Sequence, residues 1–292
     1  MRLHPAALAH VPSERFGLVV ATVALLALLA TAGSLASARR PRRVGTSSHA
    51  LATRVSVALG SLATVVAVSP PLERATATSF GAHMTQHLLL VAVAAPLLAA
   101  VRLHHLVAVG AGLRRSPRWR AASAVVRETF ALHRHPVAHV AAATVASVTV
   151  LLAWHVPALW EAAGQSAWVH GLEHAAMLGT AYWFWAVMLR RRTPAGAALL
   201  AIVVSAIAHG LLGAVLTFSP RPLYPSYAAT SAGASDLADQ QLAGLLMWVP
   251  GGVVHLVAAA AVAVAAIERA ERRSELREQR RAPGRDEAVA ST

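Results

Sequence analysis

The fold is decided by a segment that reads SFGAHMTQHLLLVAVAAPLLAAV from Ser79 to Val101. Its second half is wholly apolar, and a helix needs about 20 such residues to cross a bilayer. Two histidines, His83 and His87, stand near one end of this run. Because an ionisable group in hydrocarbon is costly, histidines at such positions mark a candidate functional site.

The rest of the chain has the same apolar character, with 56% hydrophobic and 13% charged residues and a mean hydropathy of +0.53. These values are typical of a polytopic membrane protein. Spanning helices are predicted over residues 16–38, 51–69, 79–101, 137–158, 169–189, 196–218 and 239–267. We therefore expect an all-α bundle of seven transmembrane helices over residues 1–267. A charged, partly disordered tail over residues 268–292 follows it.

Arginine placement orients this bundle. All 26 basic residues are arginine, and the formal net charge is +13. With the N-terminus outside, 22 arginines face the cytoplasm and four face outward, as the positive-inside rule requires. The C-terminus is then cytoplasmic. A signal-peptidase-like Ala36-Ser37-Ala38 is the competing interpretation, but cleavage there would place Arg39–Arg43 outside, against the bias. We expect a multi-pass plasma-membrane protein whose partner is the bilayer, and the basic charge does not indicate nucleic acid.

Further histidines gather at the outer end of the predicted bundle. His155 lies near the outer end of the fourth span, and His170 and His174 lie at the outer start of the fifth. Histidines four residues apart share one helix face, so the pairs His83/His87 and His170/His174 can each hold an ion. The chain has no cysteine, which excludes disulfides and thiolate sites.

Imidazole with thioether suits copper, particularly Cu(I), while imidazole alone also suits zinc or haem iron. The predicted ligands are His83, Met84, His87, His155, His170 and His174. Supporting residues around them are Glu173 and Asp239, which could orient an imidazole, and Gln240, Met247 and His209. A lone histidine or methionine is more often a packing residue, so the two histidine pairs carry this interpretation. The sequence HGLEH at 170–174 also matches a short zinc-protease pattern, which arises easily by chance.

Several motifs occur in an order that resembles a known family. Over about residues 75–260 the chain resembles the polytopic CtaG family of cytochrome c oxidase assembly proteins. The landmarks are His83-Met84-x-x-His87, Ala95-Pro96-Leu97, Trp154-His155-x-Pro157, His170-x-x-Glu173-His174, Leu216-Thr217-Phe218, Pro222-Leu223-Tyr224-Pro225, Asp239-Gln240-Gln241-Leu242-Ala243-Gly244 and Met247-Trp248-x-Pro250-Gly251. The resemblance implies a membrane assembly factor for haem-copper oxidase whose role involves copper. It implies an oxidase subunit or a copper chaperone as partner, and no enzymatic activity.

Two other functions remain open from the sequence. A haem-binding membrane redox protein would use histidines as axial ligands, normally from different helices, so the i,i+4 pairs would be incidental. A copper or proton transporter would need polar residues along a whole path. The inner halves of the predicted spans are almost wholly alanine, valine and leucine, with His255 the main exception, which argues against such a path.

Overall fold

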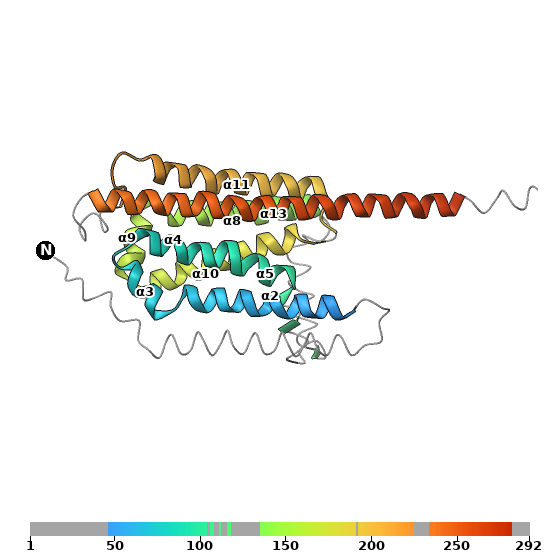
Figure 1. Cartoon of the computed structure of the whole chain (residues 1–292), viewed down its shortest axis with the longest axis horizontal. Helices are drawn as coiled ribbons and strands as arrows, with labels where there is room; N and C mark the ends of the chain where they lie inside the picture. Colours follow the sequence, from blue (N-terminus) through green and yellow to red (C-terminus); the bar gives the residue numbers. More distant parts are fainter. Residues whose placement is uncertain are drawn as a thin grey trace, which may run out of the picture.

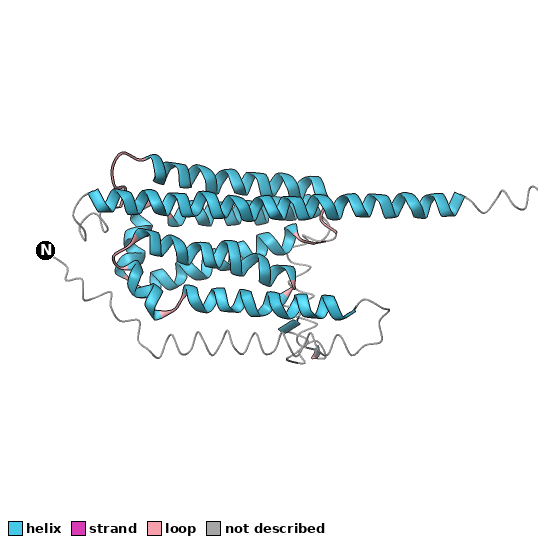
Figure 2. Cartoon of the chain, in the orientation of Figure 1, coloured by secondary structure: helices cyan, strands magenta, loops and turns pink. Residues whose placement is uncertain are grey.

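The computed structural model describes residues 46–103, 135–190, 192–224 and 234–281, together with a few positions between 106 and 117. Every regular element within these residues is helical, which confirms the predicted all-α class. The longer helices run side by side along one axis, and one of them projects far beyond the bundle (Figures 1 and 2). The predicted first span, 16–38, and the tail beyond Arg281 lie outside the described residues.

The helices follow the predicted spans closely, with additional short elements at one end. In chain order they are α2 (Thr46–Ala67), α3 (Pro70–Thr76), α4 (Phe80–Leu88), the π-helical η2 (Leu89–Ala94), α5 (Ala95–Ala100), α8 (Pro136–Trp154), α9 (Pro157–Gln165), α10 (Ala167–Met188), α11 (Ala195–Phe218) and α13 (Ala234–Arg281). The predicted fourth span is too long at its end, because α8 ends at Trp154 and a separate helix begins at Pro157. α13 continues without a break through the predicted tail boundary at residue 267.

Four described helical rods are individually long and apolar enough to cross a membrane: Phe80–Ala100, Pro136–Trp154, Ala195–Phe218 and Asp236–Gln279. The bent pair α2 and α3, with 47° between its parts, makes a fifth if it counts as one span. α10 has 22 residues but is less apolar, because its first half carries two histidines and a glutamate. The protein therefore has the helices of a membrane protein, while the count of seven spans stays a prediction.

The third predicted span is one rod with a widened turn in its middle. In η2 the N–H of Ala95 bonds the carbonyl of Leu90, five residues earlier. Pro96 follows at the start of α5, and proline can neither donate a hydrogen bond nor tolerate a tight preceding turn. The wide turn accommodates it, and such turns are frequent beside functional sites.

Two short helices close one end of the bundle, opposite the end from which α13 projects (Figure 1). Both α3 and α9 begin at proline, after a residue in extended conformation: Ser69 has ψ of 145° and Val156 has ψ of 128°. The residue before proline is sterically pushed out of the helical region, so the chain turns sharply at both places. α3 then packs on α4, and α9 packs on α10 and α8.

The most extensive contact between two described helices joins α11 to α13, and it is made through small residues. A Cβ atom on Gly244 would lie 2.6 Å from the carbonyl oxygen of Gly213, and one on Gly213 would lie 2.9 Å from the carbonyl oxygen of Gly244. The two backbones therefore approach closely, as small residues permit in membrane helices. This contact fixes α13 against the bundle and positions the side chains it contributes to the interior.

Candidate metal centre

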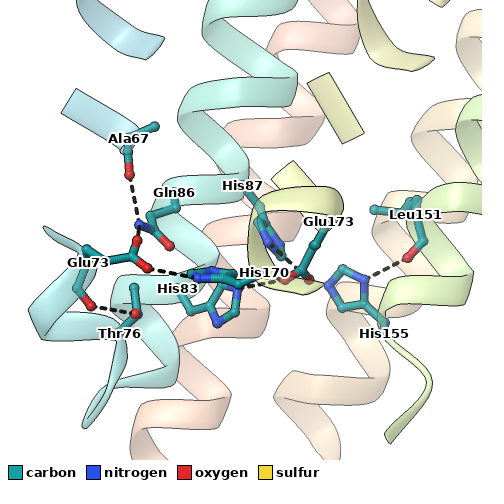
Figure 3. Close-up of polar contacts among 10 residues, drawn as sticks. All are labelled: Ala67, Glu73, Thr76, His83, Gln86, His87, Leu151, His155, His170 and Glu173. Carbon is teal, nitrogen blue, oxygen red and sulfur yellow. Dashed lines mark hydrogen bonds and ion pairs between the residues drawn. The ribbon is translucent and has the colours of Figure 1, made fainter. Parts of the chain in front are cut away.

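A fully buried carboxylate lies at the centre of the closed end. Glu173, on α10, has 0% of its surface exposed. Its Oε2 atom lies 3.5 Å from His83 Nε2, and its Oε1 atom lies 3.4 Å from His87 Nε2. Both histidines come from one face of α4, four residues apart, and the three side chains converge in Figure 3. The sequence placed Glu173 in a supporting role, whereas the structure gives it a central one.

His170 joins this group from α10 and is held by a second carboxylate. Its Nε2 atom lies 4.0 Å from Glu173 Oε2, and its Nδ1 atom lies 2.9 Å from Glu73 Oε1. Glu73 is fixed in turn by Gln86, whose side-chain amide donates to Glu73 Oε2 at 2.8 Å and to the carbonyl of Ala67 at 2.8 Å (Figure 3). His170 presents Nε2 toward Glu173, and its Nδ1 atom is bonded to a carboxylate, as is common for histidines that bind a metal through the other ring nitrogen.

The remaining two predicted histidine ligands surround the same centre. The His174 ring lies 5.7 Å from that of His87 and 4.3 Å from that of His170, between ring centroids. His155, in the turn between α8 and α9, has its ring centroid 5.8 Å from that of His87. The Nδ1–H of His155 donates to the carbonyl of Leu151 at 2.7 Å, so Nε2 carries the lone pair. That buried Nε2 atom has no hydrogen-bond partner among the described residues.

An aromatic wall covers the histidines on the side of α9. The ring of Trp160 lies 4.3 Å from that of His83 and 5.7 Å from that of His155, between centroids, and only 2% of this tryptophan is exposed. Trp160 also packs on Phe80 and Tyr224 at 4.8 and 4.9 Å. The Tyr224 hydroxyl donates to the carbonyl of His155 at 2.9 Å. This wall lowers the local dielectric and fixes the turn that carries His155.

The donor set fits a metal ion. The ligand atoms of His83, His170 and His174 all lie within 4.8 Å of one another, and so do those of His83, His87 and Glu173. Two nitrogens bound to one ion at about 2 Å each can be no more than about 4 Å apart, so binding needs shifts below about 1 Å. Among the described residues the ion-pair partners of Glu173 are all imidazoles. Buried charges are normally paired or bound to metals, and a bound cation would satisfy this carboxylate.

Two predicted supporting residues have other contacts. Asp239 accepts hydrogen bonds from the hydroxyl of Ser79 at 3.0 Å and from the backbone N–H groups of Phe80 and Gly81. It therefore caps α4 just before His83, and its described hydrogen bonds include no imidazole. Gln240 bonds the loop after α11: its amide donates to the carbonyl of Leu216 at 3.3 Å, and its Oε1 atom accepts from Leu223 N–H at 2.7 Å. Both act on the framework of the site.

Three other predicted residues lie on a cavity that adjoins the histidine cluster. Met84, Met247 and His209 line this small space of about 30 Å³, which His87 also borders. Met84 and Met247 are 2% and 7% exposed and belong to one apolar cluster. The structure thus separates the predicted ligands into an imidazole–carboxylate group and a thioether-lined space beside it.

Sequence reasoning missed Glu73, Gln86 and Trp160. Glu73 stands in a short segment, Pro70-Pro71-Leu72-Glu73, that directly follows an apolar run. Two prolines at the end of a span indicate a sharp turn, and a carboxylate within that turn was the available signal. Gln86 lies between His83 and His87 on α4 and is fully buried. A buried amide between two histidines signals a polar network, although nothing local identifies its partner.

Of three comparisons with known proteins, one finds a match. No curated protein and no solved structure matches the chain. A family model described as cytochrome c oxidase caa3 assembly factor, Caa3_CtaG, matches residues 32–269. The match extends beyond the region of about 75–260 in which the sequence motifs lie, and it covers both histidine pairs, Glu73, Glu173 and the cavity. With most of its length matched by this model, the chain belongs to the family of cytochrome c oxidase caa3 assembly factors.

Proposed function

We propose that the protein binds copper at the histidine cluster and supplies it during maturation of a caa3-type cytochrome c oxidase. The observation that carries this proposal is the buried Glu173 carboxylate, whose oxygens lie 3.4 to 4.0 Å from three imidazole nitrogens. A charge with such surroundings is costly in the interior of a membrane protein unless a cation compensates it. The family supports assembly of the oxidase, and the cluster gives that role a chemical basis.

Each residue has a defined part in this proposal. The principal ligands are His83, His87, His170 and His174. His155 is an accessory ligand, and its Nε2 atom carries the lone pair because its Nδ1–H donates to the carbonyl of Leu151. Glu173 compensates the ion's charge and can bind it directly. Glu73 orients His170 and raises the basicity of its free nitrogen. The protein carries copper as cargo and, in this proposal, performs no catalysis.

Copper is favoured over the other candidate metals by the thioethers next to the cluster. Zinc accepts imidazole and carboxylate but gains little from methionine, whereas Cu(I) binds both imidazole and thioether. Haem is disfavoured because the imidazole rings are already packed together, with His83 and His87 only 4.6 Å apart between centroids. A flat porphyrin would have to enter between two such rings. A haem-binding form would therefore need a different arrangement of α4 and α10.

A route for the ion follows from the burial of the two carboxylates. The Glu73 side chain is 19% exposed, whereas that of Glu173 is 0% exposed, and His170 lies between them. Copper arriving at the surface of α3 would meet Glu73 and His170 before reaching Glu173. In the seven-span orientation this end faces outward, so the donor and the acceptor, a copper chaperone and an oxidase subunit, would both work on the extracytoplasmic side. The arginine distribution supports that orientation.

The direct test is the copper content of purified protein after replacement of either histidine pair by alanine. We expect loss of most bound copper from both His83→Ala/His87→Ala and His170→Ala/His174→Ala. His139→Ala is the matched control, because His139 lies near the opposite end of α8 and accepts a hydrogen bond from Trp183 instead. Equal copper in all variants would refute the cluster as the site. An intense visible absorption band from bound haem, lost in the same variants, would favour the haem-binding alternative.

A cellular experiment distinguishes an assembly factor from a resident redox subunit. Cells that carry His83→Ala/His87→Ala should accumulate oxidase that is inactive and short of copper. Oxidase matured beforehand should keep its turnover after the factor is removed, since its copper is held by the oxidase's own ligands. Immediate loss of turnover on removing the factor from mature oxidase would contradict the assembly role.

A further inference from the structure

The space beside the histidine cluster has an unusual lining for a chain with few sulfur atoms. The protein contains five methionines, and three of them, Met84, Met177 and Met247, line this one small cavity of about 30 Å³. They come from α4, α10 and α13, so only the tertiary fold brings them together. Methionine is common as core filler. Three thioethers around one small cavity, together with imidazoles, also form a set of soft ligands.

One imidazole that lines this cavity is oriented by a hydrogen bond that leaves its other nitrogen for a metal ion. The Nδ1–H of His209 donates to the carbonyl of Ser205 at 2.8 Å, so its Nε2 atom carries the lone pair. His209 is 8% exposed, and this Nε2 atom is buried without a hydrogen-bond partner among the described residues. The neighbouring His255 differs: its Nδ1–H donates to Gly251, and its Nε2 atom accepts from the Ser205 hydroxyl at 3.0 Å. Of these two histidines, His209 is therefore the one with a nitrogen available to an ion.

The cavity and the cluster meet at His87. This residue lines the cavity, while its Nε2 atom lies 3.4 Å from Glu173 Oε1. Its Nδ1 atom is buried and lacks a hydrogen-bond partner among the described residues. An ion could thus pass from one set of ligands to the other by exchange at a single side chain.

The two regions differ in the ions they suit. The cluster combines imidazoles with carboxylate, which also accept Cu(II) or zinc, whereas the described residues that line the cavity include thioethers and imidazoles and no carboxylate. We propose that the cavity is a second site, selective for Cu(I), in which His209 Nε2 and the thioethers of Met84 and Met247 bind the ion, with Met177 beside them. This inference rests on the proposed copper function and adds a second, deeper binding site for the reduced ion. His87 lies between this site and the cluster.

The test is X-ray absorption at the copper edge of the purified full chain, loaded with Cu(I) under anaerobic, reducing conditions. We expect sulfur scattering in the unmodified protein. The double variant Met84→Leu/Met247→Leu should lose it and bind about one Cu(I) fewer per chain. Leucine nearly preserves the volume of methionine, so the fold should persist. The control is Met188→Leu, which changes a methionine that is also 2% exposed but belongs to a different apolar cluster; it should keep the sulfur scattering.

The variant Glu173→Gln separates this inference from the proposed function. Sulfur scattering that persists in Glu173→Gln while total copper falls supports two sites. Copper bound by nitrogen and oxygen alone, with no change in Met84→Leu/Met247→Leu, overturns the cavity site and leaves the cluster standing. Sulfur scattering with copper content unaffected by Glu173→Gln overturns the cluster and leaves the cavity site. A His209→Ala variant that retains full Cu(I) content and sulfur scattering contradicts the assigned role of its Nε2 atom.

Discussion

Two side chains near opposite ends of α10 are equally buried but have chemically opposite surroundings. Near its start Glu173 is 0% exposed and faces imidazoles, and near its end Phe184 is 1% exposed and lies in an apolar cluster. At the apolar end, the indole N–H of Trp185 donates to the carbonyl of Val91 at 3.3 Å. Packing can explain the second end by itself. It does not explain the first, where burying a carboxylate costs several kcal/mol and where the neighbouring histidines could hold a metal ion.

The largest expected effect tests the apolar end. Phe184→Ala should lower the free energy of unfolding by about 3–5 kcal/mol, because it leaves a cavity in a packed cluster. Its copper affinity, corrected for the folded fraction, should be unchanged. Unfolding of the purified protein in detergent and copper titration are the measurements. A large loss of copper affinity in the folded protein would show that the two ends are not independent.

The next effect tests the polar end. Glu173→Gln keeps the shape of the side chain but removes its charge, and we expect copper binding to weaken about 100-fold, which corresponds to about 2.7 kcal/mol. Competition with a chelator of known affinity measures it. Glu271→Gln is the control, since this substitution makes the same chemical change at an exposed position of α13. An unchanged affinity in Glu173→Gln would mean that this carboxylate is not needed to bind the ion.

A smaller effect is expected one step away from the centre. Glu73→Gln should weaken copper binding about tenfold, because the hydrogen bond that orients His170 becomes weaker without the charge. Gln86→Leu should act in the same direction, since Gln86 holds Glu73 through its side-chain amide. Copper titration of both variants and of their combination is the measurement. Fully additive effects would argue against the single chain of contacts from Ala67 to His170.

The smallest effect concerns the turn that presents His155. Tyr224→Phe removes the hydroxyl that donates to the His155 carbonyl and should cost about 1 kcal/mol of stability. Copper affinity should fall less than in Glu73→Gln, because the Nδ1–H of His155 still bonds Leu151. Thermal unfolding and copper titration separate the two quantities. A loss of affinity greater than that of Glu73→Gln would make His155 a principal ligand.

Sequence reasoning named most of the histidines that the structure brings together, because helix geometry is local. The pairs His83/His87 and His170/His174 share a face through their spacing alone, and their positions near the ends of apolar runs placed them at similar depth. Glu73 could not be found in this way. Its contact with His170 joins residues 97 positions apart in the chain and depends on how sharply the chain turns after α2. The same limit explains Asp239, whose carboxylate caps α4 from the start of α13.

The sequence by itself determined the all-α class, the positions of most long helices and the family, because apolar runs and ordered motifs are carried within short stretches. Only the tertiary structure decided that Glu173 is the centre of the histidines, that Asp239 and Gln240 hold the framework, and that three distant methionines line one cavity. The physical reason is that helix formation follows from contacts three or four residues apart. The environment of a buried side chain is set instead by other helices, and no local pattern encodes their rotation and packing.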